Sequence, residues 1–405
     1  MGDLFDPRWK ILPLREADFG PYCPPFLDDA AKAALWQAQQ DGTPTRTPVM
    51  YGVNNRVALL DDRVDSTGLS YATAFDNPEA FLKTQLLFDY ICRMRYNRFC
   101  DSPTELPEVW QVTIHFQNVY EAWYFGCPVH FEAGQIPGST PIYTGDKAEA
   151  VFDIDITQPL ARPPFKTAVE FYDYLVDYVA DKTFLDRPIA LLPPAFGTDG
   201  PLTVAMNIRG NEILTDLVMN SDYAQLLFRF IMDAEWYRRK AFFTRYDIPK
   251  NEEAGLADDS IAMLSLEQYR EFVMPHHRYY YEATNPSGGK RGMHLCGDAT
   301  RFFPLLHQEL GVTTFDTGFP VDFGACRAAL GPEVTLMGGV EVATLVQGTP
   351  EQVYARSREI LCSGVLEGGR FIFREGNNLP PNVPWANLAA MYQATFDFGT
   401  FPEAK

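Results

Sequence analysis

Short apolar segments alternate with amphipathic ones over most of the 405-residue chain, and this alternation constrains the fold more than any other feature. Eight segments have the length and the apolar or β-branched character of buried strands. They span residues 47–53, 109–116, 188–194, 254–260, 291–297, 312–318, 334–340 and 370–376. Strands that alternate with helices form parallel sheets, and eight of them predict an α/β fold of the (β/α)8 (TIM) barrel type. An open doubly wound sheet is the alternative, although no Gly-rich nucleotide fingerprint with the required spacing supports it.

Amphipathic segments between the strands predict the helices of such a barrel. The clearest cover residues 77–99, 266–284 and 349–364, and a further one covers 167–184 in a long insertion after the second strand. Residues 1–45 precede the first strand; they are Pro-rich and contain a predicted helix over residues 28–40, closed by Asp41-Gly42. We therefore expect an N-terminal helical extension over residues 1–45 and a barrel domain over residues 46–405.

Charge and cysteine usage narrow the class of protein. The net charge of −19 argues against a nucleic-acid partner or an anionic membrane, because both need clustered Lys and Arg side chains. No segment has the apolar length of a membrane span, and the N-terminus does not resemble a signal peptide. The seven cysteines are scattered and odd in number, which is typical of reduced thiols. We expect a cytoplasmic protein that binds a small molecule.

Polar side chains gather at the carboxyl ends of the predicted strands, which meet at the mouth of a barrel. They are Gln117, Asn118 and Glu121 after the second strand, Asp258 and Asp259 after the fourth, His294, Cys296 and Asp298 at the fifth, Asp316 at the sixth, Glu341 after the seventh, and Arg374, Glu375, Asn377 and Asn378 after the eighth. A solvated loop explains any one of these residues equally well. The convergence of the whole set indicates a functional site.

His294 and Cys296 are the most chemically informative pair. Two residues apart in a strand, their side chains point to the same face. Together with Asp316 on the next strand they offer imidazole, thiolate and carboxylate ligands, which suit zinc better than iron or manganese. The alternative is a core histidine beside a buried thiol, because an H-x-C pair supplies only two ligands.

Other candidates rest on weaker patterns. Arg209, after the GTDGPL loop at residues 197–202, is expected to hold a substrate carboxylate, although a capped turn explains the same loop. The adjacent His276 and His277 lie in an aromatic-rich helix and are expected to be structural or to lie on the surface. No Gly-x-Ser-x-Gly elbow is present, so the sequence gives no support for a serine hydrolase.

The order of motifs from about residue 195 to 395 resembles the uroporphyrinogen decarboxylase superfamily, which includes zinc-dependent, corrinoid-linked methyltransferases. The resemblance is carried by GPLTVAMNIRG, ADDS, LEQYREFVMPHH, HLCGDATRFFPLL, FDTGFPVDFGACRAALGPEVTLMGGVEVATLVQGTPEQV and GGRFIFREGNNLPPNVPWANL. It implies a (β/α)8 barrel with its active site in the mouth, and a homodimer, since barrels of this family commonly pair.

The chain departs from both branches of that superfamily. True uroporphyrinogen decarboxylases carry an Arg-Gln-Ala-Gly-Arg-Tyr run whose arginines hold the substrate carboxylates, and only Arg56 is available here. The methyltransferases hold zinc with His-x-Cys and a later Cys. His294 and Cys296 match the first two ligands, whereas Asn377 stands at the third position. The carboxylates expected at the mouth would also repel a substrate with eight carboxylates.

The resemblance therefore favours methyl transfer from a small methylated substrate to a corrinoid protein or a thiol, with zinc held by His294, Cys296 and Asp316. A corrinoid is expected on a partner, because the chain has no Asp-x-His-x-x-Gly run. Catalytic roles are expected for Asp258, Glu121, Glu375 and Asn377, and substrate binding for Asn118, Arg209, Asp259 and Arg56. The alternatives are a cofactor-free decarboxylase of a tetrapyrrole or another carboxylated compound, and a binding homologue without catalysis.

Overall fold

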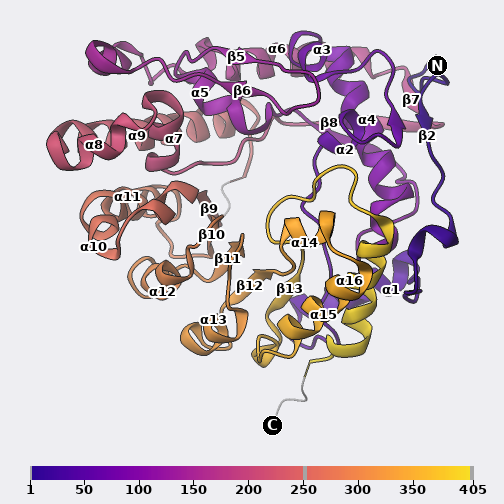
Figure 1. Ribbon diagram of the computed structural model, residues 1–405. Coiled ribbons are helices and arrows are strands. Elements are labelled where there is room, and N and C mark those ends of the chain that lie inside the picture. The colour runs from indigo at the N-terminus through magenta and orange to yellow at the C-terminus, as the bar shows by residue number, and fades with distance from the viewer. Residues whose placement is uncertain (1, 250–252, 402–405) are drawn as a thin grey trace.

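Parallel strands form the centre of the protein, which is described over residues 2–249 and 253–401 of a computed structural model (Figure 1). Five strands make one wholly parallel sheet in the order β13-β12-β11-β10-β9. They are β9 (Ala254–Ala257), β10 (Arg291–Leu295), β11 (Thr314–Thr317), β12 (Thr335–Gly338) and β13 (Phe371–Phe373). The second sheet has the order β1-β7-β8-β4. It contains β1 (Gly2–Asp3), β4 (Trp110–Thr113), β7 (Lys182–Phe184) and β8 (Arg187–Leu192), with β4 parallel to β8.

One bridge joins the two sheets and another joins the segment around Val49 to β13, in the strand order of a barrel. Asp199, beyond the end of β8, pairs in parallel with Ala257 of β9, and Val49 pairs in parallel with Phe373 of β13. The α/β barrel architecture predicted from the alternation is confirmed, and seven of the eight predicted strands are β4 and β8 to β13. Among the described residues no ladder joins the Val49 segment to β4, so the ring of backbone pairs is open at that point.

The predicted first strand, residues 47–53, is reduced to the one bridge at Val49. Pro48 has no N–H to donate to a ladder. The N–H of Val49 donates instead to Oδ2 of Asp101 at 2.7 Å. With these donors lost or diverted, the segment follows β13 without forming a regular strand.

Helices cover the outer side of the strands, and in Figure 1 α11, α12 and α13 follow the outer side of β10, β11 and β12. The α-helices are α1 (Asp29–Gln40), α2 (Arg56–Leu59), α3 (Tyr71–Asp76), α4 (Pro78–Met94), α5 (Tyr120–Tyr124), α6 (Phe165–Tyr178), α7 (Pro201–Arg209), α8 (Glu212–Met219), α9 (Ser221–Arg245), α10 (Leu266–Gln268), α11 (Met274–Thr284), α12 (Phe303–Leu310), α13 (Phe323–Leu330), α14 (Val342–Gln347), α15 (Pro350–Leu361) and α16 (Trp385–Phe398). A π-helical turn, Tyr269–Val273, connects α10 to α11.

Alternation along the strands separates the core from the interior of the ring. On β10, Met293 and Leu295 are buried, whereas His294 between them is only partly buried. The buried face packs on the helices: the ring of Phe315 on β11 lies 4.9 Å from that of Phe303 on α12. The other face carries the polar side chains into the ring, as the period of two requires.

The first forty-five residues contain more than the predicted helix. Besides α1, they form β1, which pairs with β7, and β2 (Lys10–Ile11), which pairs antiparallel with β3 (Val64–Asp65). The insertion between β4 and β8 contains α5, α6 and the hairpin of β5 (Val129–His130) and β6 (Gly138–Ser139). Within the described part of the chain, no helix combines the length and apolarity that a membrane crossing needs. All seven cysteines are free.

Candidate active site and metal centre

A cavity of about 660 Å³ opens where the parallel strands end. Segments that follow β4, β8, β9, β10 and β13 contribute to its wall, as expected for the mouth of a barrel. We call it the mouth cavity. Of the residues predicted from the sequence, it is lined by Arg56, Asn118, Asp259, His294, Cys296 and Asn377. Glu121, Arg209, Asp258, Asp316 and Glu375 lie outside its lining.

The register of β10 against β11 sets the position of His294. His294 is paired with Asp316, so both side chains project from the same side of the sheet. Nδ1 of His294 lies 2.8 Å from Oδ2 of Asp316, and Nε2 lies 3.1 Å from Sγ of Cys296. Arg374 holds Asp316 in turn, with Nη1 at 2.9 Å from Oδ1. Asp316 therefore orients the imidazole so that Nε2 faces the thiol.

Asp259 completes the cluster. The backbone N–H of Cys296 donates to Oδ1 of Asp259 at 2.6 Å. Asp259, His294 and Cys296 each present one ligand atom, and these atoms all lie within 4.8 Å of one another. The sequence analysis expected Asp316 to be the third ligand and Asp259 to bind substrate. In the structure it is Asp259 whose oxygen lies beside the ligand atoms of His294 and Cys296.

His294 and Cys296 share a hydrogen bond in this cluster, and the pKa of each depends on the other. Burial alone would lower the pKa of His294, but hydrogen bonds to Asp316 and Cys296 outweigh it and raise the pKa to about 11. Burial raises the pKa of the Cys296 thiol, and His294 opposes that rise. A metal cation can replace the proton among the same acceptors, because metal binding displaces protons from thiol and imidazole ligands.

The donor set fits zinc. One thiolate, one imidazole nitrogen and one carboxylate oxygen are ligands that zinc accepts, and three protein ligands leave a fourth position open, as in catalytic zinc sites. The hydrogen bond from Nδ1 of His294 to Asp316 is the outer-shell contact that fixes a zinc-binding imidazole. Asn377 also lines the mouth cavity, but its carboxamide is a poor zinc ligand and suits a hydrogen bond to substrate.

Asp258 has a structural environment. It is fully buried and lies 2.9 Å from Nε2 of His277 through Oδ2, while its Oδ1 accepts from the N–H and hydroxyl of Thr203 at 2.8 and 2.7 Å. These contacts tie β9 to the start of α7 and to α11. His277, expected to be structural, is the partner that holds Asp258 there.

Glu375 and Arg209 are likewise engaged away from the mouth cavity. Glu375 is buried against Arg374 and accepts from the N–H of Gly52 at 2.9 Å; burial, opposed by Arg374, raises its pKa to about 7. Arg209 forms a close ion pair with Asp216 and donates to the carbonyl of Tyr143 at 2.7 Å. The GTDGPL loop therefore does not carry Arg209 to the mouth.

That loop instead presents a residue that sequence reasoning passed over. Asp199 lines the mouth cavity and also a neighbouring cavity of about 420 Å³, and both cavities reach His294. The Gly-x-Asp-Gly turn suggested a capped loop, so only the arginine beyond it was considered. Asn54 was also missed; its Oδ1 accepts from Nε of Arg56 at 2.8 Å at the edge of the mouth cavity.

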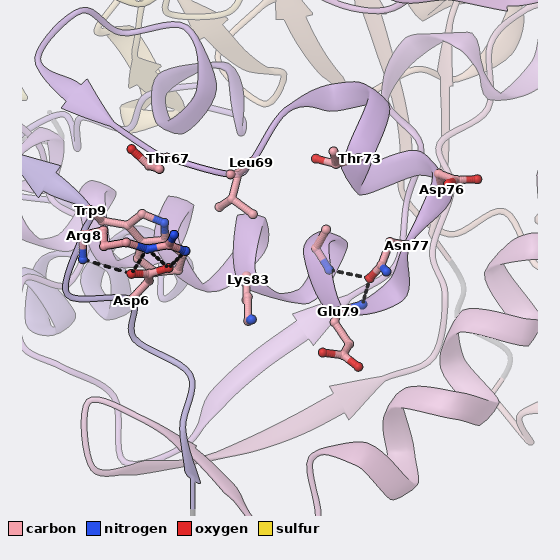
Figure 2. Close-up of a pocket in the computed structure, with 12 residues that line it drawn as sticks. Asp6, Arg8, Trp9, Thr67, Leu69, Thr73, Asp76, Asn77, Glu79 and Lys83 are labelled. Carbon is pink, nitrogen blue, oxygen red and sulfur yellow. Dashed lines mark hydrogen bonds and ion pairs between the residues drawn. The ribbon is translucent and has the colours of Figure 1, made fainter.

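Another cavity, of about 440 Å³, lies beside the N-terminal end of α4 (Figure 2). Asp6 and Arg8 pair with each other there, and the side chain of Asn77 caps α4 by accepting from the N–H groups of Glu79 and Ala80. None of the residues predicted from the sequence to act lines this cavity. The candidate site therefore remains the mouth cavity, where the residues predicted from the sequence gather.

Comparison with known proteins agrees with the barrel fold. A model of the uroporphyrinogen decarboxylase family (URO-D) matches residues 111–398. Among solved structures, a methyltransferase from Methanosarcina mazei superposes with a TM-score of 0.62 at 17% identity, covering 91% of this chain and 98% of that one. This likeness supports the same fold.

Two curated relatives come from the same organism. The methylated-thiol–coenzyme M methyltransferase of Methanosarcina mazei is 39% identical over 114 residues, which are 27% of this chain and 29% of that protein. The methylcobamide:CoM methyltransferase MtbA is 24% identical over 211 residues, 51% of this chain and 59% of that protein. In both cases the match covers less than two thirds of the relative.

Proposed function

Since the chain belongs to the uroporphyrinogen decarboxylase family, we propose that it transfers a methyl group between a small methylated substrate and a corrinoid protein or thiol. The observation that carries the proposal is the cluster of Asp259, His294 and Cys296 in the mouth cavity. The relatives support it through their names, which describe methyl transfer involving coenzyme M, a methylated thiol or methylcobamide. The corrinoid would be supplied by a partner protein.

Zinc would supply the electrophilic centre of the site, where it stabilises a thiolate or the heteroatom that loses or gains the methyl group. Asp259, His294 and Cys296 would hold it. Asp316 orients the imidazole of His294, and Arg374 fixes Asp316 by an ion pair of 2.9 Å. The backbone N–H of Cys296 fixes Asp259. These contacts preorganise the ligand atoms before substrate enters.

Other residues of the mouth cavity would position the substrate. Arg56 is half-buried, and no carboxylate of the described residues pairs with it; its Nε donates to Asn54. Asn118 and Asn377 add carboxamides that can both donate and accept. Arg56 is therefore available for an anionic group of the substrate, with the methyl group directed toward His294 and Cys296.

The decarboxylase alternative has less support from this cavity. A tetrapyrrole with many carboxylates needs several cations, and Arg56 is the one guanidinium in the described lining of the mouth cavity. Asp199 and Asp259 in the same lining add negative charge. The third alternative, a binding homologue without catalysis, predicts no turnover on any methyl donor.

The test is methyl transfer with free cob(I)alamin as acceptor, loss of cob(I)alamin being followed by its absorbance. Methanethiol derivatives, methanol and methylamines serve as donors, with zinc-loaded protein. We expect turnover with at least one donor, reduced by about 100-fold or more in Cys296→Ala and unchanged in Cys362→Ala, whose exposed thiol is a matched control. Turnover that survives Cys296→Ala contradicts the proposed site. Decarboxylation of uroporphyrinogen without methyl transfer contradicts the proposed reaction.

A further inference from the structure

Next to the mouth cavity lies a cluster of three carboxyl groups and one guanidinium, in which Glu121, Glu235 and Arg238 are buried and Asp199 is partly buried. Glu121 on α5 is 2% exposed, and Glu235 and Arg238 on α9 are 4% and 3% exposed. Asp199 lies between this group and the mouth cavity, which it lines. Its backbone N–H donates to Oε1 of Glu121 at 3.0 Å, and its carboxyl group interacts with that of Glu121. With all carboxyls ionised the cluster would carry three negative charges against one positive, a net charge of −2.

One cation cannot balance three carboxylates, two of them buried and the third partly buried. Arg238 forms a close ion pair with Glu235, lies 3.5 Å from Oε1 of Glu121, and donates to the carbonyl of Gly197 at 2.5 Å. Oε2 of Glu121 is buried and has no hydrogen-bond partner among the described residues. A carboxylate oxygen left without a donor in a buried site is costly, and a proton on it removes that cost. The cluster is therefore built to hold protons.

The direction of each pKa shift agrees with this geometry. Burial raises the pKa of Asp199 well above its usual value, and Glu121, Asp259 and Asp258 raise it further. Burial and the charge of Glu235 raise the pKa of Glu121 in the same way, against the opposing effect of Arg238. Burial, again opposed by Arg238, raises the pKa of Glu235 to about 7.

Asp199 is the member of the cluster that can reach a substrate. It lines both the mouth cavity and the neighbouring cavity, each of which also reaches His294. Its pairing with Ala257 anchors its backbone at the seam between the two sheets. The ligand atoms of the candidate metal centre are those of Asp259, His294 and Cys296, so Asp199 lies in the same cavity without belonging to that set.

We propose that Asp199 is the catalytic acid of the methyl transfer. Glu121 and Glu235 are the buried groups that return a proton to Asp199, and Arg238 positions these two carboxyl groups. The inference rests on the proposed function. In the step, the bond between the methyl carbon and its heteroatom breaks, and the electron pair stays on the heteroatom. The methyl carbon bonds to the nucleophilic acceptor, the proton of Asp199 goes to the heteroatom, and Asp199 is left as a carboxylate. In the reverse direction it accepts the proton of a thiol.

Leaving groups provide the test. The leaving group of methanol is hydroxide, which leaves as water only when it receives a proton, whereas the leaving group of tetramethylammonium is neutral trimethylamine and needs no proton. With cob(I)alamin as acceptor, Asp199→Asn is expected to lower kcat for methanol by about 100-fold or more and to leave tetramethylammonium within about threefold of the wild type. The exposed Asp177→Asn is the matched control. An equal loss on both donors, or loss of zinc from Asp199→Asn, overturns the proposal, because Asp199 would then act in binding or as a ligand.

A second measurement does not depend on turnover, and so separates failure of this inference from failure of the proposed function. The infrared spectrum of the wild-type protein at pH 7 should contain the carbonyl band of a buried, protonated carboxyl group. That band should weaken in Asp199→Asn and persist in Asp177→Asn. If the wild type turns over no donor but shows this band, the proposed reaction fails and the protonated cluster stands. If Asp199→Asn leaves the protonated-carboxyl band unchanged, the inference is wrong.

Discussion

At the scale of single residues, the site depends on contacts that the sequence places far apart. The sequence predicted His294 and Cys296 because two residues on one strand share a face. It favoured Asp316 as the third ligand and assigned Asp259 to substrate binding, whereas in the structure Asp259 is the residue whose oxygen groups with His294 and Cys296. Asp259 follows β9 and Asp316 lies in β11, on either side of β10. The choice depends on side-chain reach: Asp316 bonds the Nδ1 side of the imidazole and Asp259 approaches Cys296.

Asp316→Asn tests the assignment of Asp316 as the group that orients His294. The amide keeps the shape but loses the charge that holds the imidazole and pairs with Arg374. We expect zinc affinity to fall about 10- to 100-fold while the stoichiometry is retained, as for other outer-shell partners of metal ligands. A zinc titration against a chromogenic chelator measures this, with the exposed Asp298→Asn as control. Complete loss of zinc would instead make Asp316 a ligand.

Asp258→Ala separates a structural role from acid-base catalysis. The variant loses the hydrogen bonds to His277 and Thr203 in a fully buried site. We expect the free energy of unfolding to drop by about 3 kcal/mol, because buried partners are left unsatisfied. Urea denaturation provides the value. If the variant kept wild-type stability but lost turnover, the structural role would be wrong, and Asp258 would have the catalytic role expected from the sequence.

At the scale of elements, the alternation of apolar strands and amphipathic helices was enough to predict the barrel. The predicted strand at residues 47–53 failed because Pro48 and the side chain of Asp101 remove backbone donors, which the apolar pattern does not reveal. Side-chain direction along β10 and β11 followed the period of two. Their mutual register, which sets His294 beside Asp316, could not be read from either segment alone.

The ends of β10 and β11 also approach each other closely at Gly318. A Cβ at this position would lie 2.7 Å from the Cα of Cys296 and 3.1 Å from the N of Gly297. Gly318→Ala should therefore displace the backbone that carries the thiol and weaken zinc binding by about 10-fold or more. Gly255→Ala on β9 is the matched control, because a Cβ there meets nothing within 4 Å. Equal zinc affinity in both variants would show that the strand ends tolerate the added methyl group.

At the scale of the whole molecule, several buried titratable groups set the dependence of stability on pH. Burial lowers the pKa of His115 and His276 to about 4, so raising the pH from 4 to their usual 6.5 stabilises the fold. Burial raises the pKa of Glu235 and Glu375 to about 7, so raising the pH from their usual 4.5 to 7 destabilises it. Above pH 7 the histidine effect is complete, and the groups that keep a proton in the folded state are His294, whose pKa is raised to about 11, and Asp199 and Glu121, whose pKa values burial raises well above their usual range.

The metal-free protein should therefore lose stability as the pH rises from 7 to 8.5. In this window folded His294 keeps a proton that the unfolded chain has released at its usual pKa of 6.5. His294 should lower the free energy of unfolding by at most about 1.4 kcal/mol per pH unit, the value for one proton, and Asp199 and Glu121 add to the slope where they too keep a proton in the folded state. Urea denaturation after chelator treatment measures the slope. His294→Gln should reduce the slope by about the share of one proton, and a slope unchanged in this variant would assign that proton elsewhere.

Zinc content is the measurement that tests the central claim most directly. Elemental analysis after zinc loading and removal of free metal compares the wild type with Cys296→Ala, Asp259→Ala and the control Cys362→Ala. The account predicts a single zinc ion per chain in the wild type and in Cys362→Ala, and its loss in Cys296→Ala and Asp259→Ala. A wild type that holds no zinc, or a zinc content that Cys296→Ala leaves unchanged, would contradict a metal centre built from Asp259, His294 and Cys296.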